Sequence, residues 1–183
     1  MKRNLVNTVG KTQIYLEEGD ITQIPADAMM AAINSFGEWQ GGIDRAIYRV
    51  AGERYHSQAR KAMPLHDLQT VIAKGDRSRH RDQFNDVVFV VDDLRNPLDM
   101  VVYSGLEAAH QEQYGSLLIP AIRMGVMTGA VEKTPIETVA KLGEGILEFL
   151  RTYTETNLKD VTFVVYRDPA SLTYLGTRLR QIR

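Results

Sequence analysis

Short runs of apolar and β-branched residues recur along the chain and predict β-strands. The run VVFVV at Val87–Val91 is apolar at every position, which is typical of a strand covered on both faces. The runs LLIPAI at Leu117–Ile122 and VTFVVY at Val161–Tyr166 are almost as apolar. By this criterion the strands are Thr12–Leu16, Ala28–Ile33, Gln69–Ala73, Val87–Val91, Leu117–Ile122 and Val161–Tyr166.

Segments with helical spacing of apolar residues lie between these strands. The first begins at Ile43, after which apolar residues recur at helical intervals through Val50. Further helices are predicted at Leu98–Gln113, from Thr134 onward and at Ala170–Gln181; the third opens with a T-P-I-E capping box. Strands that alternate with helices predict an α/β fold, namely a three-layer α/β/α sandwich with a central mixed, largely parallel sheet, in a single domain over residues 1–183.

The composition narrows the chemistry that this fold can support. With 44% hydrophobic residues, 25% charged residues and a formal net charge of -1, we expect a cytoplasmic globular protein without general affinity for nucleic acid. No stretch reaches the ~20 apolar residues that a membrane-spanning helix needs, so no membrane partner is expected. The basic N-terminus has no apolar run behind it, unlike a signal peptide.

The residue types give little indication of a metal site or of redox chemistry. There is no cysteine, which excludes disulfides, thiol nucleophiles and zinc–thiolate sites. The histidines have no metal-ligand spacing and are expected to be unrelated residues at the surface or partly buried; they are His56, His66, His80 and His110. We therefore predict no metal and no cofactor. The basic run Arg77–Arg81 is interpreted as a solvated loop, and the oligomeric state stays open.

Two glycine-containing loops follow predicted strands and lead towards helices. Residues 34–44 read N-S-F-G-E-W-Q-G-G-I-D, and residues 123–130 read R-M-G-V-M-T-G-A. Open α/β sheets bind ligands at such places, because unhindered backbone N–H groups and helix starts attract anions. A diphosphate suits both loops, although glycines also serve plain turns. Asn34, Asp44 and Asp20 lie beside the first loop as candidate ligand contacts, or as ordinary turn and cap residues.

The segment Gly19–Gly52 resembles the front half of a macro domain. It contains G-D-I-T, then A-D-A-M-M-A-A-I-N-S, then Q-G-G-I-D-R-A-I-Y-R-V-A-G, where the family pattern has G-D-I-T, V-D-A-I-V-N-A-A-N-S and G-G-G-V-D-x-A-I-H-R-A-A-G. The later segment Ser116–Gly129, S-L-L-I-P-A-I-R-M-G-V-M-T-G, resembles the family's S-I-A-F-P-A-I-S-T-G-V-F-G. The resemblance implies an α/β/α domain whose partner is ADP-ribose or an ADP-ribosylated protein.

The resemblance also implies a role for each matching position. Asp20 would accept the adenine amino group with Ile21 beside it, and Asn34 would hold the distal ribose. In the family's hydrolase branch, Asn34 and Asp44 would be the catalytic residues, with Asp44 activating a water that attacks the anomeric carbon of an ADP-ribosyl ester. The remaining implied ligand contacts are Gly41, Gly42 and Ile43 at the distal ribose and diphosphate, and Gly125, Val126 and Met127, whose backbone N–H groups would face the diphosphate.

The chain departs from the family pattern at both loops. Ala31, Gln40 and Tyr48 stand in place of an Asn, a Gly and a His. The other departures are Trp39, Arg45, Arg123, Met124, Thr128 and Gly129. Three functions therefore stay open: a hydrolase of ADP-ribosyl esters, a module that binds ADP-ribose without turnover, and a macro-type protein that has lost ADP-ribose binding and serves as an interaction or structural module.

Overall fold

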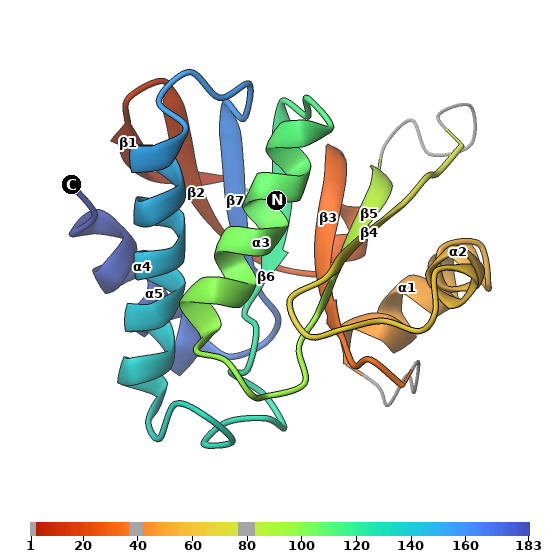
Figure 1. Cartoon of the computed structure of the whole chain (residues 1–183). Coiled ribbons are helices and arrows are strands. Elements are labelled where there is room, and N and C mark those ends of the chain that lie inside the picture. Colours follow the sequence, from red (N-terminus) through yellow and green to blue (C-terminus); the bar gives the residue numbers. More distant parts are fainter. Residues whose placement is uncertain (1–2, 37–41, 77–82) are drawn as a thin grey trace.

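A mixed, largely parallel sheet forms the centre of the molecule in the computed structural model, which describes residues 3–36, 42–76 and 83–183 (Figure 1). Its strands are β1 (Asn4–Val9), β2 (Thr12–Glu18), β3 (Ala26–Ile33), β4 (Thr70–Ala73), β5 (Phe84–Val91), β6 (Ser116–Pro120) and β7 (Asp160–Val165). The strand order across the sheet is β1-β2-β7-β6-β3-β5-β4. The five inner strands run parallel, whereas β1 and β4 run antiparallel to their neighbours at the two edges.

Helices cover both faces of this sheet and produce the three layers expected from the sequence (Figure 1). On one face lie α3 (Leu98–Gln111), α4 (Pro135–Thr152) and α5 (Pro169–Arg180); on the other lie α1 (Ile43–Ala51) and α2 (His56–Lys61). In β3, Met30 packs with the first group of helices and Met29 with the second, because successive strand residues point to opposite faces. Burial on both faces explains why the central strands are apolar throughout.

The hydrophobic pattern of the sequence did not predict two of the elements, β1 and α2. β1 reads NLVNTV and lies half-exposed at the sheet edge, joined to β2 by a tight turn with Gly10 at φ 58°. α2 reads HSQARK and lacks an apolar stripe of its own. An edge strand and a short helix need few apolar residues, because one side of each faces water.

Several strand and helix ends differ from the prediction by a few residues. The strand predicted to reach Ile122 ends at Pro120, where the Ile122 N–H turns back to the Pro120 carbonyl at 2.8 Å. The capping box predicted at the start of α4 is confirmed, since the Thr134 hydroxyl accepts from the Glu137 N–H at 3.1 Å. β7 ends at Val165, one residue earlier than predicted. In the described ranges, none of the helices has the length and apolar content that a bilayer crossing requires.

Candidate functional site

The two predicted loops leave neighbouring parallel strands at the same edge of the sheet. β3 pairs with β6 through Ala28–Leu117 and Met29–Leu118. The chain passes from β3 to α1 on one face and from β6 to α4 on the opposite face (Figure 1, lower edge). Adjacent strands whose connections diverge to opposite faces leave a crevice beyond their carboxyl ends, which is where open α/β sheets bind ligands.

The loop after β6 exposes a row of backbone donors. Within the described part of the chain, the N–H groups of Gly125, Val126 and Met127 make no hydrogen bond. The loop is closed further on by turn hydrogen bonds, from the Thr128 N–H to the Gly125 carbonyl at 3.0 Å and from the Ala130 N–H to the Met127 carbonyl at 3.1 Å. Val126 is 98% exposed and Met127 42% exposed. Consecutive free N–H groups in a turn form a concave site suited to an anion.

The loop after β3 ends in an uncapped helix start. Gly42 is the N-cap residue of α1, with φ 56° and ψ -125°, and among the described residues no side chain caps this helix. The first N–H groups of an α-helix lack intrahelical acceptors and carry a partial positive charge. The α1 start thus adds donors at the same edge as the loop after β6. Gly41, Trp39 and Gln40 lie outside the described residues.

Asn34 is placed directly beyond β3, at the beginning of this loop. Its side-chain oxygen accepts from the Phe36 N–H at 3.1 Å, which makes a local turn. The adjacent Ser35 N–H donates to the Asp93 carboxylate at 2.9 Å, so the loop is tied to the segment after β5. Asn34 therefore serves as a turn residue and remains half-exposed at the carboxyl edge of the sheet.

Asp44 lies in the first turn of α1 and is buried, with 9% exposure. Its carboxylate is 3.6 Å from Nε2 of His56, which α2 brings beneath α1 with 2% exposure. Burial raises the pKa of the Asp44 carboxyl, and the His56 ring partly offsets this effect. The His56 ring also lies against Phe89 of β5, with ring centroids 5.4 Å apart. The expectation of a surface or partly buried histidine is wrong for His56, and no spacing in the sequence signals its pairing with Asp44.

At the β2 side of the same edge, Asp20 acts as a cap. Its Oδ1 accepts from the N–H and the hydroxyl of Thr22, at 3.0 and 2.7 Å, and begins the short 3₁₀ helix η1 (Ile21–Gln23). Ile21 is buried with 7% exposure. The cap alternative raised from the sequence thus describes Asp20 correctly, and the half-exposed carboxylate remains at the sheet edge.

An exposed aromatic residue that the sequence assigned to a strand also lies at this edge. Tyr166 follows β7 and is 61% exposed. The end of β7 is joined to the end of β2 by the hydrogen bond from the Gly19 N–H to the Val165 carbonyl, at 2.9 Å. The Arg167 guanidinium lies 5.1 Å from the Tyr166 ring centroid. Tyr166 is therefore an exposed aromatic residue at the same edge of the sheet as Asp20.

The described residues at which the chain departs from the family pattern differ in their burial. Ala31 is fully buried inside β3, Tyr48 is 52% exposed on α1, and Arg45 is exposed. The Arg123 side chain is buried away from solvent, with 2% of its surface exposed, between two carboxylates.

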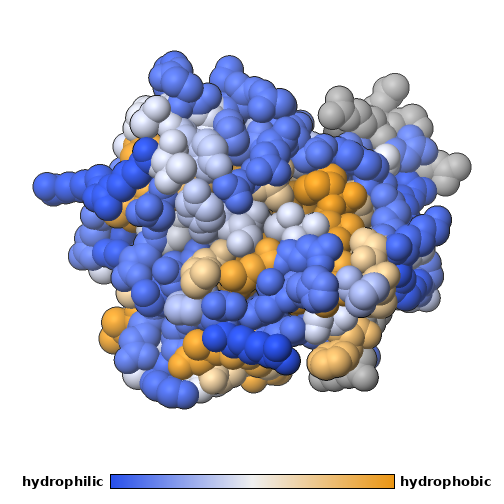
Figure 2. All heavy atoms as spheres, in the orientation of Figure 1, coloured by the Kyte–Doolittle hydropathy of each residue, from blue (hydrophilic) through white to orange (hydrophobic). Residues whose placement is uncertain are grey.

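Apolar side chains are exposed on the segments around the crevice. Figure 2 shows hydrophobic groups along the lower edge of the molecule, where the loop after β6 lies in Figure 1. Exposed apolar residues of these segments are Phe36, Val126, Met127 and Ile136. Exposed charged residues, including Arg95, Lys133 and Arg167, lie on the segments at this edge as well.

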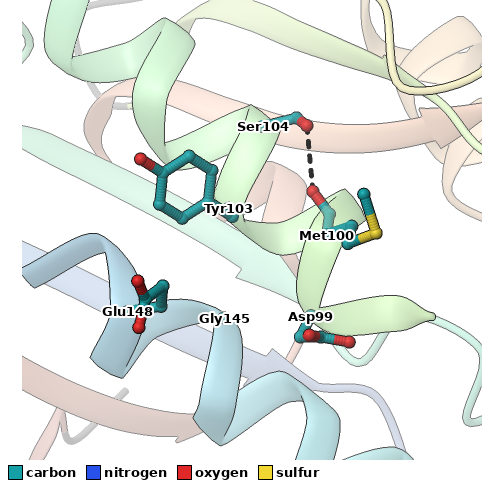
Figure 3. Close-up of a pocket in the computed structure, with 6 residues that line it drawn as sticks. All are labelled: Asp99, Met100, Tyr103, Ser104, Gly145 and Glu148. Atoms are coloured by element: carbon teal, nitrogen blue, oxygen red, sulfur yellow. Dashed lines mark hydrogen bonds between the residues drawn. The ribbon is translucent and has the colours of Figure 1, made fainter. Parts of the chain in front are cut away.

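A separate hollow of about 270 Å³ lies between α3 and α4. Figure 3 shows Tyr103 of α3 and Glu148 of α4 facing one another across it, and the Ser104 hydroxyl donating to the Met100 carbonyl. None of the predicted site residues lines this hollow. Among the residues that the structure describes, no cluster of histidine and carboxylate side chains could hold a metal ion.

Comparisons with known proteins identify the fold. No family model matches the sequence. An uncharacterized protein of Sulfolobus acidocaldarius is 27% identical over 165 residues, which cover 86% of each chain. A Trypanosoma brucei macrodomain solved in complex with ADP-ribose superimposes with a TM-score of 0.78 at 19% identity, covering 96% of this chain and 73% of that one. A mutant of the Oceanobacillus iheyensis macrodomain gives 0.76 at 16% identity, covering 98% and 97%. The chain therefore has the macrodomain fold, in a form whose sequence has diverged widely.

Proposed function

We propose that this protein binds ADP-ribose, or a related ADP-ribosyl ligand, in the crevice between the loops after β3 and β6. The observation that carries the proposal is the row of free N–H groups at Gly125, Val126 and Met127, which lie at the same edge of the sheet as the start of α1. Backbone N–H groups from two sides can share the charge of a diphosphate without a basic side chain. The Trypanosoma brucei macrodomain of the same fold, solved with ADP-ribose, supports this ligand.

The two ends of the edge suit the two ends of such a ligand. At the β2–β7 end, Asp20 offers a carboxylate to an amino group and Tyr166 offers a ring face to a purine. At the β3 end, Asn34 offers an amide to ribose hydroxyls. The ligand would thus lie across the ends of β7 and β6, with its diphosphate over the free N–H groups.

Calorimetry with ADP-ribose, ADP and AMP tests this assignment. We expect ADP-ribose and ADP to bind more tightly than AMP, because only they carry a diphosphate for both sets of donors. If none of the three ligands binds, the proposal is wrong and the alternative stands: a macro-type protein that serves as an interaction or structural module. Binding of a mono-ADP-ribosylated protein by the same site would identify the partner as a modified protein.

Hydrolysis of an ADP-ribosyl ester is a second candidate function, favoured by the buried Asp44. Because burial raises its pKa, the Asp44 carboxylate is a stronger base than an exposed one. It would take a proton from a water whose oxygen bonds to the anomeric carbon, while the bond from that carbon to the ester oxygen breaks. The products are ADP-ribose and the free carboxylic acid. Without turnover, the same site is a binding module.

Release of ADP-ribose from a mono-ADP-ribosylated protein distinguishes enzyme from binder. We expect Asp44→Ala to abolish release while ADP-ribose binding persists. Asp160→Asn is a matched control, because Asp160 pairs with Arg3 at the opposite end of β7. Equal release by the wild type and Asp44→Ala, or no release by the wild type, removes the hydrolase function and leaves binding untouched.

A further inference from the structure

A buried ion cluster lies directly beneath the loop after β6. The Arg123 Nε and Nη2 donate to the two Asp92 oxygens at 3.0 and 2.6 Å. Its Nη1 donates to both Glu132 oxygens at 3.0 and 2.9 Å, and Nη2 also donates to the Asn96 carbonyl at 2.9 Å. The Arg123, Asp92 and Glu132 side chains are only 2%, 6% and 5% exposed. A buried guanidinium with partners for all its donors holds its surroundings firmly.

This cluster joins segments that are distant in the sequence. Asp92 follows β5 and Arg123 follows β6, although β3 lies between these strands in the sheet. Glu132 precedes α4 and also accepts from the Leu98 N–H at the start of α3, at 2.9 Å. Most importantly, the Arg123–Glu132 ion pair closes residues 124–131 into a loop whose two ends are cross-linked.

The tip of this loop has few contacts of its own. Met124 is buried, but Gly125, Val126, Met127 and Thr128 are all exposed. The hydrogen bonds within the tip are short-range turn bonds, including the Thr128 hydroxyl to the Gly125 carbonyl at 2.7 Å. The conformation that turns three consecutive N–H groups outward therefore depends on how the loop ends are held.

The backbone at Arg123 supports the same conclusion. Its φ is 59°, a left-handed conformation that residues with a β-carbon adopt at an energetic cost. Strained residues of this kind persist only where their surroundings over-determine them. The ion pairs of the Arg123 side chain provide that constraint.

The same segment after β5 also holds the loop on the other side of the crevice. Asp93 accepts from the Ser35 N–H at 2.9 Å, and its own N–H donates to Asp67 at 3.0 Å. Asp92 and Asp93 thus reach the second and first loops, respectively, from consecutive positions. Ser35 and Arg123, from the two sides, are thus both held by this one segment.

We propose that Arg123 is a positioning residue for ligand binding: through Asp92 and Glu132 it holds the 124–131 loop so that the N–H groups of Gly125, Val126 and Met127 face the diphosphate. This inference rests on the proposed function for its ligand but concerns a separate property, the order of the loop. It also gives the departure from the family's small residue at this position a structural role.

The test compares Arg123→Gln with Arg95→Gln, which removes an exposed arginine from the same edge without touching the cluster. Hydrogen–deuterium exchange of residues 124–131 reports loop order, and calorimetry reports ADP-ribose affinity. Chemical-shift titration with adenosine reports the affinity of the site for a ligand that has no phosphate groups. We expect Arg123→Gln to speed hydrogen exchange in this loop and to weaken ADP-ribose binding by about tenfold or more, while its affinity for adenosine is unchanged. Arg95→Gln should match the wild type in all three measurements.

Each outcome separates the inference from the proposed function. A folded Arg123→Gln protein with unchanged loop exchange overturns the positioning role, and so does an equal loss of ADP-ribose and adenosine. If Arg123→Gln does not fold, Glu132→Gln decides by the same measurements, because the amide keeps an acceptor for the Leu98 N–H. If the wild type binds no ADP-ribose, the proposed ligand is wrong. Hydrogen exchange of residues 124–131 still supports or refutes the inference that Arg123 holds this loop.

Discussion

Replacing Gly42 with alanine tests whether the start of α1 contributes to anion binding. Gly42 has φ 56° and ψ -125°, a conformation that residues with a β-carbon rarely adopt. A β-carbon added there would meet no atom within 4 Å. The substitution therefore introduces no clash, and its whole effect comes from the backbone conformation.

The expected loss of folding free energy is that of one strained residue, about 1–3 kcal/mol. For a chain of this size, each kcal/mol lowers the melting temperature by about 2–4 °C. Relief of the strain requires the α1 start to shift, which moves its N–H groups away from the ligand. We expect ADP-ribose affinity to fall by about tenfold, or roughly 1.4 kcal/mol.

Gly52→Ala is the matched control for strain. Gly52 follows the other end of α1 with φ 59° and ψ -140°, and its added β-carbon also meets nothing within 4 Å. Gly125→Ala is the control for stability, since Gly125 has open space and no left-handed φ, so alanine should leave stability unchanged or raise it by up to about 1 kcal/mol.

Denaturant unfolding and calorimetry on these three variants check the reasoning. Gly42→Ala and Gly52→Ala should lose similar stability, but only Gly42→Ala should lose affinity. Wild-type stability in Gly42→Ala would refute the strain argument. An equal loss of affinity in Gly52→Ala would show that the start of α1 has no special relation to the ligand.

Three further predictions concern charge and stacking. Burial raises the pKa of Asp44, so ionisation of this carboxyl destabilises the fold as pH rises from about 3.9 through the folded pKa, by at most about 1.4 kcal/mol per pH unit. In denaturant unfolding, the stability of Asp44→Asn relative to the wild type should therefore increase between acid and neutral pH. Parallel stability curves for the two proteins would contradict this. Burial opposes ionisation of Glu132, but a backbone N–H and the Arg123 guanidinium outweigh it and hold the pKa of Glu132 below its usual range. The stability that this carboxylate adds is therefore lost as pH falls from about 4.3 through the folded pKa. In unfolding measurements over this pH range, the difference in stability between the wild type and Glu132→Gln should narrow. A difference in stability that stays constant would be evidence against this role. Tyr166→Ala should weaken the binding of ADP-ribose and of AMP alike, by about 1–3 kcal/mol. Tyr174→Ala, which removes another exposed tyrosine, should leave both affinities unchanged. If calorimetry shows no difference between the two variants, a stacking role for Tyr166 is refuted.

The hydrophobic pattern predicted the buried strands and the long helices because their burial leaves a direct trace in residue type. It missed β1 and α2, which are only partly covered and therefore have no continuous apolar signal. It also extended one strand past Pro120, because the residues beyond it are apolar for a different reason: Ile122 is buried in a turn.

The candidate site divides in a similar way. Loop sequences indicated where backbone donors and helix starts occur, and the resemblance of Gly19–Gly52 indicated a ligand. The sequence showed Arg123 only as a departure from the family pattern, because no local pattern indicates where its side chain points. In the structure the side chain is directed to Asp92 and Glu132.

By itself, the sequence determined the fold class and the positions of the strand-to-helix loops, since these depend on local periodicity and on glycine, proline and cap residues. Only the tertiary structure decided which groups meet. Strand order placed the carboxyl ends of β3 and β6 side by side, α2 carried His56 to Asp44, and the path of the chain beyond β5 and β6 buried Arg123 between two carboxylates. The physical reason is that these contacts join residues far apart in the chain, so their energies depend on geometry that no local pattern records.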